Sequence, residues 1–377
     1  NARLQLPGSK SLTNRELVLS GLAIEPTVVH WPLHSRDTAL MIEGLRTLGV
    51  RIVETPGDGA FGPDLLVTPG ELLGGGSIEC GLAGTVMRFL PPVASLALGP
   101  VVFDGDPSAR RRPMRAMIDA LRALGIDVSD DGRGALPFSL YGTGEVAGGD
   151  LEIDASASSQ FVSGLLLSAP RFRQGLRLRH SGDSLPSIPH IQMTIACLAS
   201  RGVTVENPEP GYWVVAPQPI AGGSVAIEPD LSNAAPFLAA AIIAGGTVTI
   251  EGWPEATTQV GADLETLLAR FGAQVTRDHA SLTIDGGAGL LGGAALPGIN
   301  VDLSTGGELA PAVIAIAALA STPSRITGIG HLRGHETDRL AALATEINAI
   351  GGEVRELEDG VRLITAITTI WREKSKS

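Results

Sequence analysis

The sequence repeats one pattern five times, and this repetition limits the possible fold more than any other feature. In each copy, apolar residues at positions i, i+3, i+4 and i+7 predict an amphipathic helix, and a glycine followed by β-branched residues predicts a helix end and then a strand. The copies read ALMIEGLRTLGVRIV, RAMIDALRALGIDV, IQMTIACLASRGVTV, ADLETLLARFGAQV and LAALATEINAIGGEV. Their glycines, Gly49, Gly125, Gly202, Gly272 and Gly351, follow one another at intervals of 70 to 79 residues.

A second segment, apolar on nearly every side, precedes each of these helices. The five segments read TNRELVLSGLA, VMRFLPPVASLALG, QFVSGLLLSAP, NAAPFLAAAIIAGG and ELAPAVIAIAALA. Such all-round apolarity predicts a buried helix. Solenoid repeats are about 20–50 residues long, so the longer period here indicates a small α/β subdomain. The five repeat units either form an open array or pack in two groups of three, and the second arrangement needs a sixth unit.

Composition restricts the class of protein. The chain has 377 residues and a net charge of −12, which argues against a general nucleic-acid binder. The two cysteines, Cys80 and Cys197, form no motif and fit a reducing compartment. The longest apolar stretches, such as residues 309–320, are shorter than the roughly 20 residues of a membrane span. We therefore expect a cytoplasmic globular protein without a membrane or nucleic-acid partner.

Polar residues stand at the start of all five apolar helices. They are Lys10-Ser11, Gly84-Thr85, Ser158-Ser159-Gln160, Asp230 with Ser232-Asn233, and Gly306-Gly307-Glu308. Most are ordinary N-cap residues, but the positive charge of Lys10 opposes the helix dipole. An anion between Lys10 and the helix start would remove that conflict, because free N–H groups and the dipole attract the same anion. If the five starts converge, they form an anion site that Arg15 and Arg88 also reach.

Three further clusters have both a structural and a functional interpretation. Arg110 to Arg112 are either a solvated charge run or a guanidinium clamp for carboxylate or phosphate. Residues 335–339 are either helix caps or part of a site, and the His331–His335 spacing predicts no metal centre because Gly334 interrupts it and no third ligand follows. The basic stretch 171–180 is interpreted as a solvated strand edge because it lacks an aromatic platform for nucleic acid.

Five motifs occur in a fixed order: LPGSKSLTNR, AGTVMR, ARRRPM, SASSQF and HETDRL. With this order and spacing, over residues 4 to about 364, the chain resembles the 5-enolpyruvylshikimate-3-phosphate synthases. The resemblance implies an α/β fold of two globular domains, each of three β/α units around a pseudo-threefold axis, of the inside-out α/β barrel type. It implies one domain of residues 11–228, a second of residues 1–10 plus 229–377 with an incomplete sixth unit, and an active site in the cleft between them.

The family's reaction moves the enolpyruvyl group of phosphoenolpyruvate to the 5-hydroxyl of shikimate 3-phosphate and releases phosphate, in the biosynthesis of aromatic amino acids. The resemblance therefore implies a transferase with two anionic substrates, no metal and no organic cofactor. We separately expect a monomer. Two alternatives stay open. One is the related transferase of UDP-N-acetylglucosamine, which carries a mobile-loop cysteine, and the other is a truncated form that binds ligand without turnover.

The resemblance also assigns residues. Contacts to shikimate 3-phosphate fall on Lys10, Ser11, Arg15, Ser158, Ser159, Gln160, Ser187, Glu308 and His335. Contacts to phosphoenolpyruvate fall on Lys10, Gly84, Arg112, Gln160 and Arg339. The catalytic residues it implies are Lys10, Glu308 and Glu336. Carboxylates near the reacting atoms can move protons, so Glu308 is the expected base toward the hydroxyl and Glu336 the expected acid/base at the methylene carbon, while the cations stabilise phosphate and carboxylate charge.

The chain departs from the family pattern at three places. Leu82 stands where many members have a polar residue, and His335 stands where many have lysine. The family's later His-Arg pair and the Lys of a KT-P motif, both in the sixth unit, have no match. We therefore expect either that the sequence omits residues or that the protein is a truncated member.

Overall fold

The computed structural model describes residues 1–334 and 337–365. The chain divides into two compact units, a larger one of Pro7–Glu228 and a smaller one of Asn1–Leu6 with Pro229–Ser377. From the sequence we placed the first boundary after Lys10, and the structure places it after Leu6. The reason is that the Ser9 N–H donates to the carbonyl of Glu228 at 2.8 Å, which ties residues 7–10 to the larger unit.

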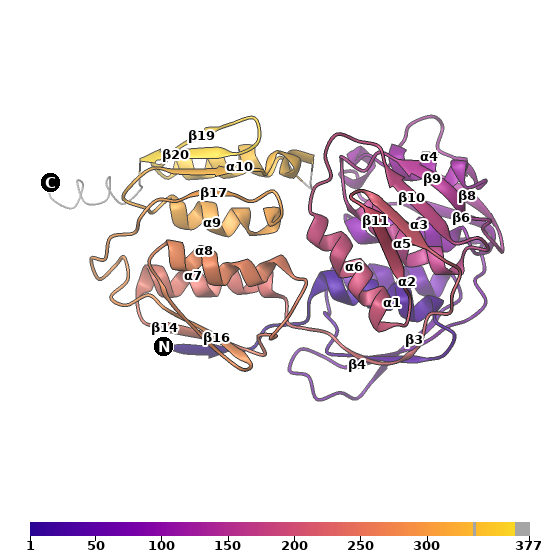
Figure 1. The fold of residues 1–377 in the computed structure, drawn as a ribbon, viewed down its shortest axis with the longest axis horizontal. Helices are drawn as coiled ribbons and strands as arrows, with labels where there is room; N and C mark the ends of the chain where they lie inside the picture. The colour runs from indigo at the N-terminus through magenta and orange to yellow at the C-terminus, as the bar shows by residue number, and fades with distance from the viewer. Residues whose placement is uncertain (335–336, 366–377) are drawn as a thin grey trace. The chain divides into compact units, whose positions relative to one another are not determined.

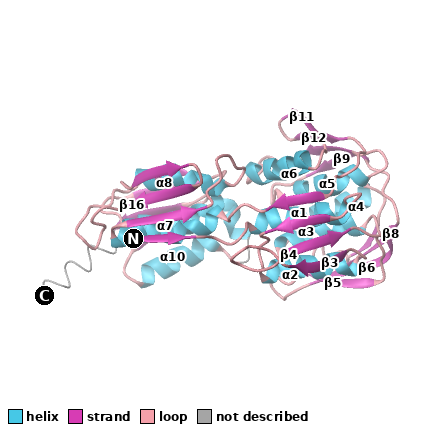
Figure 2. Ribbon diagram, turned by 90° about the horizontal axis from the view of Figure 1, so that it is seen from below, coloured by secondary structure: helices cyan, strands magenta, loops and turns pink. Residues whose placement is uncertain are grey.

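The larger unit contains three four-stranded sheets with one topology (Figures 1 and 2). In each, an outer strand pairs in parallel with its neighbour and the remaining pairs are antiparallel. The first sheet has the order β13 (Gly223–Ala226), β2 (Thr27–His30), β4 (Asp64–Thr68), β3 (Arg51–Thr55). The second is β5 (Gly76–Glu79), β6 (Leu98–Asp104), β8 (Phe138–Thr143), β7 (Asp127–Ser129). The third is β11 (Val205–Glu209), β12 (Tyr212–Val215), β10 (Leu176–His180), β9 (Gly149–Ile153).

Two kinds of helix accompany these sheets, as the sequence predicted. The inner helices are α1 (Lys10–Leu22), α3 (Gly84–Ala94) and α5 (Gln160–Ser168), and they pack on one another in the core. The outer helices are α2 (Arg36–Thr47), α4 (Arg115–Ala123) and α6 (Ile188–Ser200). The glycine after each outer helix has a positive φ, 97° at Gly49, 86° at Gly125 and 78° at Gly202. This left-handed conformation ends a helix and suits glycine because it has no Cβ.

The smaller unit repeats the same arrangement twice within the described residues. One sheet is β1 (Ala2–Leu4), β14 (Thr247–Glu251), β16 (Ser281–Asp285), β15 (Gln274–Asp278), and the other is β17 (Asn300–Asp302), β18 (Ser324–Thr327), β20 (Val361–Thr365), β19 (Glu353–Glu356). Its inner helices are α7 (Ala235–Ala244) and α9 (Ala310–Ala317), and its outer helices are α8 (Leu264–Arg270) and α10 (Arg339–Ala349). Helix α7 packs on β14 and β16, and α8 packs on β15.

One inner helix is less buried than its sequence predicted. Helix α7 is apolar throughout, yet Phe237 is 45% exposed and Ala240 is also exposed. The physical reason is the number of neighbours. In the larger unit each inner helix packs on two others, whereas among the described residues of its own unit α7 packs on the single inner helix α9.

A buried carboxylate shapes the loop that follows β7. Asp130 is 3% exposed, and it accepts hydrogen bonds from Arg122 at 2.7 Å and from the N–H groups of Gly132 and Gly134. These contacts, the Arg122 guanidinium first, lower the pKa of Asp130 from its ordinary 3.8 to about 2. The same loop accepts the Met114 N–H at the Gly134 carbonyl, so the network fixes the chain next to Arg112.

We predict that Asp130→Asn lowers the free energy of unfolding at pH 7 by about 2 kcal/mol, because a depressed folded-state pKa stabilises the fold above the unfolded-state pKa. The difference between wild type and variant stays constant down to about pH 5 and shrinks as pH falls through 3.8 toward 2. Denaturant titrations at several pH values measure it. The control is Asp131→Asn, whose exposed ion pair with Arg133 contributes about 0.5 kcal/mol or less; equal losses in the two variants contradict the prediction.

Candidate active site

The inner helices of the larger unit begin side by side. The Asn14 amide of α1 donates to the Thr85 hydroxyl of α3 at 2.7 Å, and Arg88 of α3 donates to the Gln160 side chain of α5 at 3.4 Å. Each bond joins first or second turns, so the helices run in the same direction and their N-terminal ends lie together. Unpaired N–H groups and positive helix dipoles therefore accumulate at one place. The expected convergence of helix starts is found for these three of the five helices, and their binding of an anion stays a prediction.

Two buried arginines surround the start of α3. Arg88 is 3% exposed and Arg112 is 9% exposed. A Cβ added to Gly84 would lie 2.9 Å from Arg88 Nη1, 2.9 Å from the Gln160 Oε1 and 3.2 Å from Arg112 Nη2. A side chain at position 84 would therefore displace at least one of these three head groups. Arg112 also donates to the carbonyl of Leu82 at 3.0 Å, which orients its guanidinium toward the same spot.

Lys10 is the first residue of α1, after the N-cap Ser9, whose hydroxyl accepts from the Leu12 N–H. Its side chain is half exposed, and its Nζ lies 3.4 Å from Oδ2 of Asp37 in α2. We expected an anion to resolve the conflict between Lys10 and its helix dipole. In this structure the carboxylate of Asp37 supplies one, at a distance and exposure that leave the ammonium accessible to a ligand.

Arg15 is almost fully buried and pairs with groups inside the larger unit. It is 1% exposed, and it donates to the Thr194 hydroxyl at 2.8 Å, the Ser11 carbonyl at 2.8 Å and the His190 carbonyl at 2.9 Å. Arg15 thereby fastens the first turn of α1 to the first two turns of α6. Its contact with shikimate 3-phosphate stays a prediction, and the structure adds a role in positioning Ser11.

The serines of the third repeat stand at two helix starts. The Ser158 hydroxyl accepts from the Gln160 N–H at 3.3 Å, and Ser159 is buried directly before α5. Ser187 precedes α6 and has a φ of +53°. A non-glycine residue in this left-handed region is strained, and such strain concentrates at functional sites. The carbonyl of Ser187 accepts the His190 N–H at 2.9 Å, which holds this turn in place.

The smaller unit brings a carboxylate and a hydroxyl together where its inner helices begin. The Ser232 hydroxyl, in the 3-10 turn Leu231–Ala234 before α7, donates to Glu308 Oε1 at 2.5 Å. Glu308 is exposed in the turn Gly307–Leu309 before α9. Asp263 lies near the same turn, because a Cβ added to Gly306 would lie 4.0 Å from Asp263 Oδ2. Partial burial raises the pKa of the Asp263 carboxyl. The helix starts of this unit therefore present acids, where those of the larger unit present cations.

Sequence reasoning missed one residue beside Glu308. A Cβ added to Gly307 would lie 2.7 Å from Nε2 of His331, so the imidazole packs on the same turn. The only sequence signal was the His331–His335 spacing, which we interpreted in terms of metal binding alone. Within residues 1–334 and 337–365, no group of three His, Cys, Asp or Glu side chains is placed to hold a metal ion.

Arg339 opens helix α10, as expected for the HETDRL motif. The N-cap Asp338 accepts the Ala341 N–H at 3.0 Å, and this bond, followed by contact with Arg333, lowers the pKa of the Asp338 carboxyl. Asp338 is thus a structural cap. The other two residues that we assigned in this motif, His335 and Glu336, lie outside the described residues, and their roles stay predictions.

The basic stretch 171–180 is not a strand edge, contrary to our interpretation. Its strand β10 lies between β12 and β9. Arg177 makes a bidentate contact with the Asp150 carboxylate, at 2.6 and 2.8 Å, and Arg179 donates to Glu209 at 2.7 Å. Carboxylates of β9 and β11 thus match these charges, which suits a structural surface better than a nucleic-acid contact.

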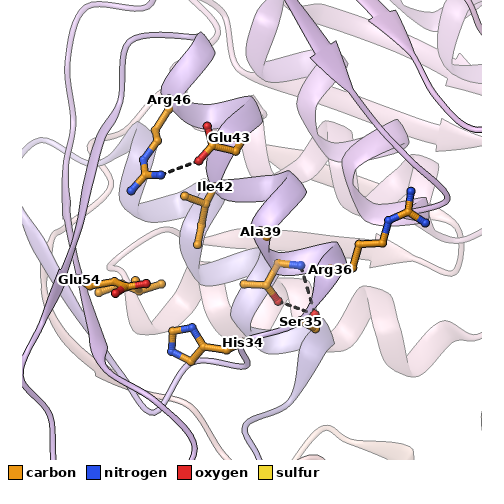
Figure 3. Close-up of a pocket in the computed structure, with 10 residues that line it drawn as sticks. His34, Ser35, Arg36, Ala39, Ile42, Glu43, Arg46 and Glu54 are labelled. Carbon is orange, nitrogen blue, oxygen red and sulfur yellow. Dashed lines mark hydrogen bonds and ion pairs between the residues drawn. The ribbon is translucent and has the colours of Figure 1, made fainter.

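A cavity of about 580 Å³ lies elsewhere, along α2 (Figure 3). Its wall combines the apolar Ile42 and Leu65 with polar groups that include the ion pair of Arg46 and Glu43 at 2.5 Å. None of the site residues assigned from the sequence lines it. The cavity is therefore separate from the helix starts described above.

Two units of α/β repeats, with inner helices enclosed by sheets and polar groups at the helix starts, define a protein of the inside-out α/β class. The chain belongs to the EPSP synthase (3-phosphoshikimate 1-carboxyvinyltransferase) family, which residues 1–374 match. It is 53% identical over 363 residues to a 3-phosphoshikimate 1-carboxyvinyltransferase of Kocuria rhizophila, covering 95% of this chain and 80% of the relative.

Solved structures show the same fold. An EPSP synthase from Acinetobacter baumannii superposes with a TM-score of 0.76 at 24% identity, covering 97% of this chain and 81% of the other. The enolpyruvyl transferase NikO from Streptomyces tendae gives a TM-score of 0.73 at 17% identity, covering 97% and 82%. In the part of the chain that the structure describes, none of the helices combines the length and apolarity needed to cross a membrane.

We predict that Gly84→Ala weakens anion binding at the larger unit. The added methyl group displaces Arg88, Gln160 and Arg112 from their meeting point, and loss of one charge-assisted hydrogen bond raises the dissociation constant by about tenfold or more. Calorimetric titration with inorganic phosphate measures the change. Thermal melting serves as the control, because the displaced atoms are the ends of flexible side chains. Unchanged phosphate affinity in a folded variant contradicts the prediction.

Proposed function

We propose that this protein transfers the enolpyruvyl group of phosphoenolpyruvate to the 5-hydroxyl of shikimate 3-phosphate and releases phosphate. The observation that carries the proposal is the meeting of Arg88, Arg112 and Gln160 at Gly84, a compact cationic site in a chain of net charge −12. Family membership and the 53% identical relative support the same reaction. The proposal includes a role in aromatic amino acid biosynthesis, a cytoplasmic location and a monomeric enzyme without nucleic-acid or membrane partners.

In this proposal the larger unit supplies most of the anion contacts. Gly84, Arg112 and Gln160 hold phosphoenolpyruvate, Lys10 contacts both substrates, and Arg339 of the smaller unit adds a second guanidinium. Shikimate 3-phosphate contacts the serines and the remaining residues of the family motifs, which are Ser11, Arg15, Ser158, Ser159, Gln160, Ser187, Glu308 and His335.

The chemistry requires proton transfers in both of its steps and no redox step. The 5-hydroxyl oxygen bonds to the central carbon of phosphoenolpyruvate while the hydroxyl loses a proton and the methylene carbon gains one. In the second step the carbon–oxygen bond to phosphate breaks, and the new methyl group returns a proton. Glu308 acts as the base toward the hydroxyl, and Glu336 exchanges the proton at carbon. Lys10, Arg112 and Arg339 stabilise the charge of phosphate and carboxylate.

The position of Glu308 supports its assignment. Its carboxylate is exposed and acceptor-only, and the Ser232 hydroxyl donates to it at 2.5 Å. Such a contact orients the carboxylate without neutralising its charge. Glu308 can therefore receive a proton from a ligand hydroxyl, whereas Asp338, which caps a helix, is already committed to backbone N–H groups.

We predict that Glu308→Gln lowers kcat by about a hundredfold or more, because the amide has the shape of the acid but cannot accept the proton. The Michaelis constant for phosphoenolpyruvate changes by less, since Glu308 is assigned to the other substrate. Steady-state phosphate release measures both constants. The matched variant Ser232→Ala keeps the base and removes only its orienting contact, so its kcat falls by a smaller factor. Turnover of the Gln variant at the wild-type rate rejects the assignment.

Two measurements distinguish the proposed function from its alternatives: the choice of substrate for the rival transferase, and turnover for a ligand-binding form. The rival transferase normally carries a cysteine in a mobile loop, but Cys80 and Cys197 are both buried, and burial raises the pKa of each thiol. We predict phosphate release from phosphoenolpyruvate with shikimate 3-phosphate and none with UDP-N-acetylglucosamine. Calorimetry runs alongside, because binding of shikimate 3-phosphate without phosphate release identifies a ligand-binding form and refutes catalysis by this chain.

A further inference from the structure

A second polar cluster lies in the first sheet of the larger unit, away from the helix starts. It takes one residue from each of three adjacent strands: Ser224 of β13, His30 of β2 and Asp64 of β4. Ser224 is in register with Val28, two residues before His30, and Val29 is in register with Leu65. Because side chains alternate along a strand, the three polar side chains share one face of this sheet.

The three side chains form a continuous hydrogen-bonded chain. His30 Nδ1 lies 2.5 Å from Asp64 Oδ2, and His30 Nε2 lies 3.0 Å from Ser224 Oγ. The other oxygen of Asp64 accepts the Trp31 N–H at 3.0 Å. The carboxylate is 5% exposed and the imidazole 35% exposed. A buried carboxylate on Nδ1 favours the tautomer with its proton there and leaves Nε2 to accept from the serine.

We propose that Ser224, His30 and Asp64 form a second catalytic site, a serine esterase triad for small activated carboxylic esters. The arrangement contains a nucleophile within hydrogen-bond reach of a base, and a base oriented by a third group. Trp31 is 46% exposed, and its ring centroid lies 6.4 Å from that of His30. It offers an apolar surface beside the base, which favours esters with an aromatic leaving group.

The sheet edge also supplies a donor for the developing oxyanion. The N–H groups of Gly223 and Ile227 donate to the carbonyls of Pro26 and His30. Backbone groups alternate in direction along a strand, so the N–H groups of Ser224 and Ala226 point to the other side of β13, the outermost strand of its sheet. The N–H of the nucleophile itself is a common oxyanion donor in serine hydrolases.

The reaction balances without any further reactant than water. Ser224 Oγ bonds to the ester carbonyl carbon as its proton passes to His30 Nε2. The bond to the leaving oxygen breaks, and that oxygen takes the proton from Nε2. Water then attacks the acyl-serine, giving its proton to Nε2, and the carboxylic acid leaves as Ser224 regains its proton. One ester and one water yield one acid and one alcohol or phenol.

The repeat architecture provides a matched control. Ser77 occupies on β5 the place of Ser224 on β13: each is exposed on the outer strand of its sheet, in register with a valine of the next strand. Two residues beyond that valine, β2 has His30 whereas β6 has Asp104. Ser77 thus has similar surroundings without an imidazole, and any chemistry due to exposure alone appears at both serines.

The test is labelling with diisopropyl fluorophosphate, which phosphorylates an activated serine and releases fluoride. We expect one label per chain, on the peptide that contains Ser224. Ser224→Ala abolishes it, Ser77→Ala leaves it unchanged, and His30→Gln and Asp64→Asn slow it at least tenfold. Hydrolysis of p-nitrophenyl acetate falls in parallel. Enolpyruvyl transfer and thermal melting stay at wild-type values in Ser224→Ala, which separates this proposal from the function proposed above.

Three results overturn the proposal. The first is no label on Ser224 under conditions that fully label a known serine hydrolase. The second is equal labelling of Ser77 and Ser224. The third is an undiminished labelling rate in His30→Gln with a wild-type melting temperature. That variant keeps the test decisive if Asp64→Asn fails to fold because Asp64 also holds the Trp31 backbone.

Discussion

The close parallel packing of the inner helices is the constraint on which the rest of the larger unit depends. A Cβ added to Gly164 of α5 would lie 2.2 Å from the carbonyl of Arg88 in α3, so only glycine lets these backbones approach. This contact aligns the first turns of the two helices, and Asn14 aligns α1 with them through Thr85. The helix starts, with their unpaired N–H groups, are therefore gathered by core packing before any ligand is considered.

That packing also places arginine head groups beside uncharged acceptors in an acidic protein. On the sheets, arginines such as Arg177 and Arg179 contact carboxylates, which cancel their charge locally. At the helix starts, Arg88 donates to the oxygens of Gly84 and Gln160, and Arg112 donates to Leu82. Those acceptors are uncharged, so these contacts orient the guanidinium groups without neutralising them. Orientation without neutralisation is what an anion site needs.

Local features of the fold were predictable from the sequence because each depends on a few neighbouring residues. The stop glycines illustrate this: Gly272 and Gly351 have φ values of 92° and 95°, as expected for the residue after a helix. Features that depend on tertiary partners were not predictable. The pairing of Lys10 with Asp37, the burial of Arg15 against α6 and the exposure of Phe237 all follow from which helix lies next to which.

The same distinction explains the two polar clusters. The family motifs mark the helix starts because those residues are contiguous in sequence, and chain order alone brings Ser158, Ser159 and Gln160 to one turn. Asp64 follows His30 by 34 residues and Ser224 follows it by 194 residues. No motif links the three. Only the strand order β13-β2-β4 and its register bring them together. A repeat fold that places equivalent strand ends in several sheets can thus acquire a second polar cluster through substitutions at equivalent positions, as the contrast between His30 and Asp104 illustrates.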